Sequence, residues 1–266
     1  VFVAVAGILI MISIIARISV TNVVAGLGVA TAVLAVVFKD TLLGLVASIQ
    51  LSTNHMVKLG DWITIPGRNI DGTVIDMTLY TVKVENFDKT ILTVPTYALI
   101  SESFQNWKGM EDSGVRRIKR EIRIDVRSIT FITPGLIESI AQRPMTGKWI
   151  SENSDEIEGI KRGEPTSLTN LGAFRAYMSE YLRNHRDIDS KMPVMVRDMP
   201  PTESGMPVEI YCFSKINSWV PFEDVQSTVL DYAFAVVGEF GLKLFQSPSG
   251  NDLEALRSLT NQKQKI

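Results

Sequence analysis

The clearest pattern in this chain is a pair of apolar segments at its beginning. Residues 1–19 are mostly apolar and contain Arg17, and residues 20–52 are mostly apolar around the charged pair Lys39 and Asp40. A helix needs about 20 apolar residues to cross a lipid bilayer. The second segment is long enough for this, and we interpret the first as the end of a spanning helix. The pattern therefore predicts a membrane α-helical hairpin.

Small residues recur at helical spacing in the second segment. Gly28, Ala32 and Ala35 fall on one face of the predicted helix, and larger valines such as Val29 and Val33 occupy the other side. Ala25 and Gly26 extend the small-residue face by a turn. Helices in lipid have no hydrophobic driving force to associate, and they approach one another through small residues. We therefore expect Ala25, Gly28 and Ala35 to pack against other copies of the same helix.

The charged pair Lys39 and Asp40 has two interpretations. Charges within a membrane segment are costly and usually face a water-filled cavity or a partner. In the first interpretation the two residues mark the membrane surface and lie among lipid headgroups. In the second, which we favour, the helix bends near residues 39–44, with Asp40 and Gly44 at the bend, and its second half lies along the surface.

The pattern changes completely over residues 53–108. Short segments with the alternation and the β-branched residues typical of strands are separated by turn residues; they are residues 61–65, 73–75, 79–84 and 90–94. Several short strands at close turn spacing predict a small β-barrel or sandwich. About 50 residues give a small core, so oligomerisation would help to stabilise it.

The remaining chain alternates between strand and helix patterns over residues 109–246. Strands are expected near residues 121–126 and 207–214, and helices near 134–142, 169–184 and 222–240. This order predicts an α/β sandwich of ferredoxin-like type. The apolar side of the helix at 169–184 is more typical of a core than of a binding surface. Residues 247–266 form a polar tail with at most a short helix near 253–259.

Several of these segments resemble the small-conductance mechanosensitive channel (MscS) family. The resemblance rests on the small-residue helix, on the motifs at residues 59–63 (LGDWI), 71–74 (DGTV) and 91–95 (ILTVP), and on Asn106. In the second half, residues 169–177 and residues 196–202, followed by 207–211, resemble the miniconductance branch of this family. Asp40 lies at or near the helix-kink glycine of the family.

The resemblance implies a homo-heptamer with a central pore. Residues 20–38 would line the pore, residues 53–108 would form an Sm-like β-barrel domain, and the soluble domains would enclose a cytoplasmic vestibule. Alignment with the family places the closed gate at Ala32 and Val36, and helical periodicity adds Val29 and Val33. Lys39 and Asp40 would then lie at the pore mouth. By comparison with shorter members, residues 145–193 are an insertion.

Composition argues against other classes of function. The formal net charge of −2 gives no footprint for nucleic acid, and the single cysteine, Cys212, excludes an internal disulfide framework. Gly26 and Gly28 imitate a dinucleotide-binding fingerprint, but they lie in a membrane helix rather than after a strand. With His55 and His185 far apart in the sequence, no metal set is evident. We therefore expect no enzyme activity and no cofactor.

We predict a mechanosensitive ion channel subunit, which membrane tension opens to release ions and small osmolytes on hypo-osmotic shock. Basic residues after the second helix favour cytoplasmic soluble domains, in a multi-pass protein of the bacterial inner membrane whose earlier helices precede residue 1. Membrane lipids and permeant ions are the expected partners besides the homo-oligomer. The alternative is a membrane-anchored osmosensor or scaffold whose cytoplasmic domain binds a partner.

Overall fold

The computed structural model describes residues 2–248 and residue 250. The chain divides into two compact units, Val1–Gly109 and Met110–Ile266, and each is described by itself. The helix expected near residues 253–259 lies outside the described residues.

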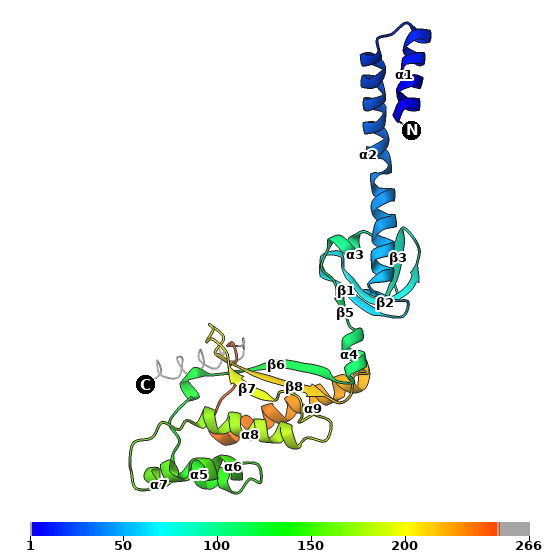
Figure 1. The fold of residues 1–266 in the computed structure, drawn as a ribbon. Coiled ribbons are helices and arrows are strands. Elements are labelled where there is room, and N and C mark those ends of the chain that lie inside the picture. Colours follow the sequence, from blue (N-terminus) through cyan, green and yellow to red (C-terminus); the bar gives the residue numbers. More distant parts are fainter. Residues whose placement is uncertain (1, 249, 251–266) are drawn as a thin grey trace. The chain divides into compact units, whose positions relative to one another are not determined.

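Two helices begin the first unit and run in opposite directions (Figure 1): α1 (Phe2–Ala16) and α2 (Val20–Thr53). In the connection Arg17 has a left-handed backbone, with φ 56°, and Ser19 caps α2 by accepting a hydrogen bond from the amide of Asn22. In its most apolar window α2 has a mean hydropathy of 2.1, and none of that window is buried. α2 is therefore long and apolar enough to cross a membrane, and the predicted helical hairpin is present.

The backbone of α2 is helical without interruption from Val20 to Thr53. Lys39, Asp40 and Gly44 all lie within this helix, so the segment after residue 40 is not a separate element. Proline is absent from α2, and strong helix formers such as Leu42 and Leu43 follow the charged pair. A bend of the helix near residues 39–44 stays a prediction.

An antiparallel sheet follows α2, with the strand order β4-β3-β2-β1-β5. Its strands are β1 (Trp62–Ile65), β2 (Ile70–Met77), β3 (Thr81–Asn86), β4 (Ile91–Pro95) and β5 (Gln105–Asn106), with the short helices η1 (Pro66–Arg68) and α3 (Ala98–Ser101) between them. The four predicted strands are confirmed. β5 was not predicted, because its two residues are too few to show an alternating pattern.

The end of α2 contributes to the core of this sheet. Leu51 is fully buried together with strand residues such as Ile63, Val74 and Val84. Ala47, one turn earlier, is also buried. The β domain and the last turns of α2 therefore share a single hydrophobic core.

A three-stranded antiparallel sheet with the order β6-β8-β7 organises the second unit. After α4 (Lys108–Ser113), the elements in chain order are β6 (Arg116–Ile124), η2 (Val126–Ser128), α5 (Pro134–Ala141), α6 (Gly147–Glu152), α7 (Ser154–Lys161), α8 (Asn170–Asn184), β7 (Met195–Asp198), β8 (Met206–Ser214), α9 (Trp219–Val237) and η3 (Gly238–Phe240). One buried cluster joins this sheet to α5, α7, α8 and α9.

The connectivity of this sheet is ferredoxin-like. β8 lies between β6 and β7 and is antiparallel to both, as in a split βαβ unit. On the free side of β6, Ile124 forms an antiparallel bridge with Leu244, and the Phe245 amide donates to the Arg123 carbonyl at 2.8 Å. The fourth strand of the ferredoxin-like arrangement is thus reduced to a single bridge, and the predicted fold class is confirmed.

Residues 145–193, which the sequence predicts to be an insertion, contain the helices α6, α7 and α8. The polar run at residues 151–158 lies largely in α6 and α7, where Ile157 is buried. α8 buries its apolar side, including Phe174 and Met178. The interpretation of that side as core is confirmed.

Candidate functional site

The predicted gate residues lie on the exposed part of α2. The exposed fractions of Val29, Val33 and Val36 are 67%, 58% and 75%, and Ala32 is exposed as well. A Cβ atom added at Gly28 would meet nothing within 4 Å. Within the described residues of a single chain these side chains are uncovered, as expected for positions that contact lipid, water or other copies.

The helical geometry separates Lys39 from Asp40. Successive residues of an α-helix are rotated by about 100°, so the two charged side chains leave α2 in clearly different directions. Asp40 shares a sector of about 60° with the three predicted gate valines. Lys39 falls instead within about 40° of Gly28 and Ala35, on the small-residue side. The two charged side chains therefore lie on different faces of α2.

The last part of α2 is attached to the β domain through a close contact at Gly44. A Cβ atom at this position would lie 3.1 Å from Cδ1 of Tyr80, which precedes β3. Gly44, Ala47 and Leu51 are the buried residues of α2. Absence of a side chain at Gly44 lets the helix approach the tyrosine ring, a reason for this glycine that the local sequence pattern did not indicate.

A buried carboxylate connects the end of α2 to the sheet. Asp61 is only 6% exposed, and its Oδ2 accepts hydrogen bonds from the Lys58 amide and from Nδ2 of Asn106, each at 2.9 Å. The same Asn106 nitrogen donates to the Met56 carbonyl at 2.9 Å. Asn106 thus ties β5 both to the segment that leaves α2 and to the turn before β1.

The DGTV motif lies beside the LGDWI motif. Oδ1 of Asp71 accepts hydrogen bonds from the Trp62 indole at 2.7 Å and from the Thr64 hydroxyl at 2.8 Å. Trp107, which the sequence did not single out, donates to the Thr64 hydroxyl at 2.8 Å and stacks on Trp62 with ring centroids 4.7 Å apart. The two motifs and the residues around Asn106 therefore form one hydrogen-bonded junction.

Strand packing requires a glycine at position 72 of the DGTV motif. A Cβ atom there would lie 2.1 Å from the Glu85 carbonyl oxygen, a distance that no side chain tolerates. The position is the third residue of β2, opposite Asn86 at the end of β3. The glycine is therefore needed for the pairing of these two strands.

The metal-ligating side chains of the described residues do not gather into a metal-binding set. Within residues 2–248 and 250, no group of three or more His, Cys, Asp or Glu side chains could hold a metal ion. Burial raises the pKa of the Cys212 thiol to about 12, so this sulfur stays protonated and unreactive.

Comparison with known proteins places these features in a family. The family model described as "Mechanosensitive ion channel, beta-domain" matches residues 40–109, the segment that holds the end of α2 and the junction around Asn106. An uncharacterized MscS family protein of Helicobacter pylori is 26% identical over 234 residues, which are 87% of this chain but 35% of that protein. The chain therefore spans about a third of the length of that relative.

Two further proteins show the same likeness. The low conductance mechanosensitive channel YnaI of Escherichia coli is 25% identical over 197 residues, 73% of this chain and 45% of that protein. The cryo-EM structure of Arabidopsis thaliana MSL1 has the same fold, with a TM-score of 0.60 at 16% identity over 88% of this chain and 69% of that one. The family resemblance of the sequence motifs is thus confirmed, while the miniconductance branch stays a prediction. The chain is therefore similar to proteins of the MscS family of ion channels, and residues 40–109 match the β-domain of that family.

Proposed function

We propose that this chain is the pore-forming part of a mechanosensitive channel subunit, which opens under membrane tension and passes ions and small osmolytes on hypo-osmotic shock. The observation that carries the proposal is the two-part burial of α2. Its first part is apolar and exposed, whereas Gly44, Ala47 and Leu51 are buried against the β domain. Such a helix is free to move in the membrane while its other end is held by a soluble domain.

The pore would form between copies of α2. The resemblance to the family supports a homo-heptamer, and Ala25, Gly28 and Ala35 provide a small-residue side for helix contacts. Val29, Ala32, Val33 and Val36 would then surround the axis as an apolar ring. A narrow apolar ring excludes water and blocks ions without a physical plug, and tension would favour the wider, open packing.

The charged residues would lie just beyond this ring. Asp40 continues the valine sector and would face the permeating ions, whereas Lys39 would face the neighbouring helix or the headgroups. Asp40 and Gly44 also remain the proposed place of a bend on assembly. Since Gly44 contacts Tyr80, a bend there would transmit motion of the helix to the β domain.

The proposed domain organisation follows the family. Residues 1–19 would end a membrane domain, residues 20–52 would form the pore helix, and residues 53–108 and 109–246 would build a cytoplasmic vestibule below the bacterial inner membrane. Residues 145–193 would be an insertion in that vestibule, and residues 247–266 a tail. Lipids between the helices are the natural ligands whose differential binding would shift the gate.

Patch recording of the full-length protein in liposomes tests the proposal. Stepwise suction should open discrete conductances that are absent from protein-free liposomes. The alternative, a membrane-anchored osmosensor or scaffold, predicts no tension-dependent current from correctly assembled protein. Normal membrane insertion and oligomerisation without current at any suction short of membrane rupture would overturn the channel proposal in favour of the scaffold.

A further inference from the structure

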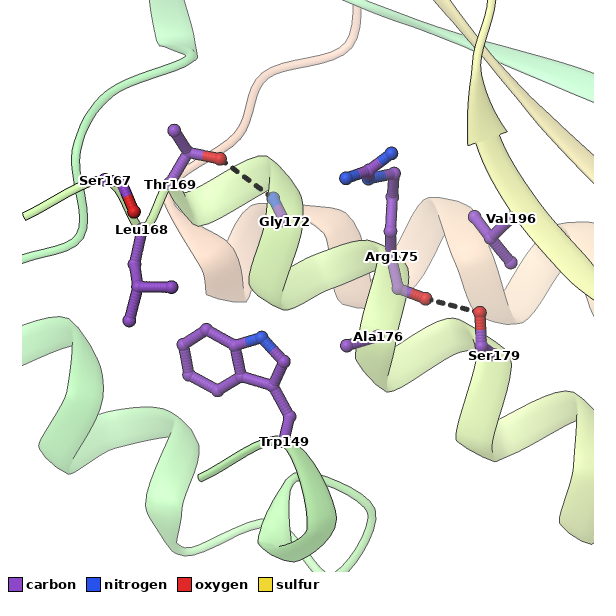
Figure 2. A pocket seen from close by; sticks show the side chains of 9 residues that line it. All are labelled: Trp149, Ser167, Leu168, Thr169, Gly172, Arg175, Ala176, Ser179 and Val196. Atoms are coloured by element: carbon purple, nitrogen blue, oxygen red, sulfur yellow. Dashed lines mark hydrogen bonds between the residues drawn. The ribbon is translucent and has the colours of Figure 1, made fainter. Parts of the chain in front are cut away.

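A hollow of about 500 Å³ lies along the exposed side of α8, outside the pore helix and the β domain. Figure 2 shows its floor, which consists of small residues of α8: Gly172, Ala176 and Ser179. Trp149 of α6 and Arg175 of α8 lie on opposite sides of this floor. Both side chains line the hollow, and the small residues of α8 lie between them.

Arg175 is only partly satisfied by its protein partner. Its Nη1 lies 2.9 Å from Oδ2 of Asp198, while its Nε and the Oδ1 of Asp198 are buried and have no hydrogen-bond partner in the described part of the chain. The guanidinium carries five N–H donors in a planar fork, so the pair with Asp198 orients the group. The buried Nε is out of a ligand's reach, and the terminal nitrogens are the donors that remain for a carboxylate.

The other polar groups of the hollow are already engaged. The Ser167 hydroxyl donates to Glu156 at 2.9 Å, the Ser179 hydroxyl donates to the Arg175 carbonyl at 2.8 Å, and the Thr169 hydroxyl accepts from the Gly172 amide at 3.1 Å. The first turn of α8 is thus capped by its own side chain. Recognition of a ligand therefore depends on Arg175 and Trp149.

The charges around the hollow are balanced. Asp198 offsets Arg175, and an adjoining hollow that shares Trp149 is lined by two acidic and two basic residues, namely Glu152, Glu180, Lys148 and Arg183. A phosphate dianion would find little excess positive charge here. A ligand without net charge fits better, with its anionic end on Arg175 and its cationic end against the electron-rich face of the tryptophan ring.

We infer that this hollow binds a small zwitterionic solute of the betaine or amino-acid type, with the carboxylate on Arg175 and the ammonium group on Trp149. The binding itself is independent of conduction. Its consequence rests on the proposed function: a site of this kind would let the insertion respond to the zwitterionic solutes that cells accumulate against osmotic stress.

Equilibrium dialysis of the full chain in detergent against labelled glycine betaine tests the inference. Sucrose keeps the osmolality constant throughout. Two close analogues serve as ligand controls: choline lacks the carboxylate, and 3,3-dimethylbutyrate has a carbon in place of the charged nitrogen. We expect saturable binding of glycine betaine, and competition by each analogue that is at least about tenfold weaker, since each lacks one charge-assisted contact.

Variants separate the site from general solute effects. Arg175→Met and Trp149→Leu should each weaken binding at least about tenfold, whereas Arg162→Met, on an exposed arginine of the same unit that pairs with Glu158 and Glu164, should bind normally. Arg175→Lys and Trp149→Phe serve where the harsher changes impair folding, and they should weaken binding less.

Three results would overturn the inference: no saturable binding, equal binding by the Arg175 and Trp149 variants that fold, or equal competition by 3,3-dimethylbutyrate. Because the assay measures no current, a silent channel that binds betaine would count against the proposed function alone. A tension-gated channel that fails to bind would count against this site alone.

Discussion

The carboxamide of Asn106 donates a hydrogen bond to the buried carboxylate of Asp61 at 2.9 Å, although 45 residues separate the two in sequence. This contact closes the β domain at the point where the chain leaves α2. The same nitrogen holds the Met56 carbonyl, so a single side chain fixes the exit of the helix and the start of β1. A displacement of α2 would therefore reach the sheet through Asn106.

Replacement of Asn106 by alanine should loosen this junction. Oδ2 of Asp61 would keep its hydrogen bond from the Lys58 amide and lose the one from Asn106, and an under-bonded buried carboxylate costs about 1–3 kcal/mol. Urea unfolding of the full chain in detergent, followed by tryptophan fluorescence, measures the change. Gln105→Ala, at an exposed neighbour in β5, is the matched control. If both variants unfold at the same urea concentration, the junction is not a determinant of stability.

Substitution of Gly72 by alanine should prevent the pairing of β2 with β3. The new Cβ atom would lie 2.1 Å from the Glu85 carbonyl oxygen and 2.6 Å from Cα of Asn86, and backbone atoms cannot yield as a flexible side chain does. Overpacking costs about 1–3 kcal/mol or more, so we expect poor expression or a much lower melting temperature. Gly67→Ala, where a Cβ atom meets nothing within 4 Å, should melt like the wild type. A normally stable Gly72→Ala protein would contradict the packing argument.

The alternating strands could be predicted from sequence because one side of each faces a core. β3 illustrates this, since Val82 and Val84 are fully buried, while the residues that alternate with them, Thr81, Lys83 and Glu85, are partly exposed. α8 could be predicted for the same reason, because its apolar residues recur at the spacing of a helix. In these elements the order of apolar and polar residues itself shows which side is buried, and the family motifs indicated the fold class.

Other features depend on contacts that no local pattern records. Gly44 was interpreted as a helix bend, and its close neighbour proved to be Tyr80, far along the chain. Trp107 and Arg175 were not singled out because their roles arise from residues that only folding brings near, Trp62 and Asp198. The short strand β7 and the polar helix α7 lack a long apolar repeat, so no element was predicted there.

Mild acidification should destabilise the protein through His185. Burial lowers the pKa of this imidazole, and its Nδ1 accepts the Asp187 amide at 3.2 Å, which requires an unprotonated nitrogen. The unfolded state, with a histidine pKa of about 6.5, therefore takes up the proton first. The contribution of the unprotonated His185 imidazole to the stability of the fold is complete above about pH 6.5. It is lost as the pH falls through the lower pKa of the folded state.

Melting curves between about pH 7.5 and 5.5 test this, with His185→Asn expected to flatten the dependence. Glu156 should not interfere. The Ser167 amide lowers its pKa, so its contribution is lost only below about pH 4.5. An equally steep dependence in His185→Asn would assign the effect to another group.

Ion preference should respond more to Asp40 than to Lys39. Asp40 shares the sector of the gate valines, and a ring of carboxylates at the pore mouth would favour cations. Asp40→Asn should shift the reversal potential in asymmetric salt toward anion permeation, whereas Lys39→Gln should shift it less. If neither shifts it, both residues lie at the headgroups; a larger shift for Lys39→Gln would reverse the assignment of the two faces.

The gate itself is tested at Val36, the most exposed of the three predicted gate valines at 75%. A narrow valine ring stays dry because its side chains offer no hydrogen bonds, so Val36→Ser would place a ring of hydroxyl groups at the constriction and hydrate it. We expect spontaneous openings at little or no suction, and slow growth of cells that produce the variant. Leu34→Ser removes a comparable apolar group about 160° away around the helix, on the side that would face lipid, and should leave the threshold nearly unchanged. If Val36→Ser assembles normally and opens at the wild-type tension, water exclusion at this position is not what closes the pore.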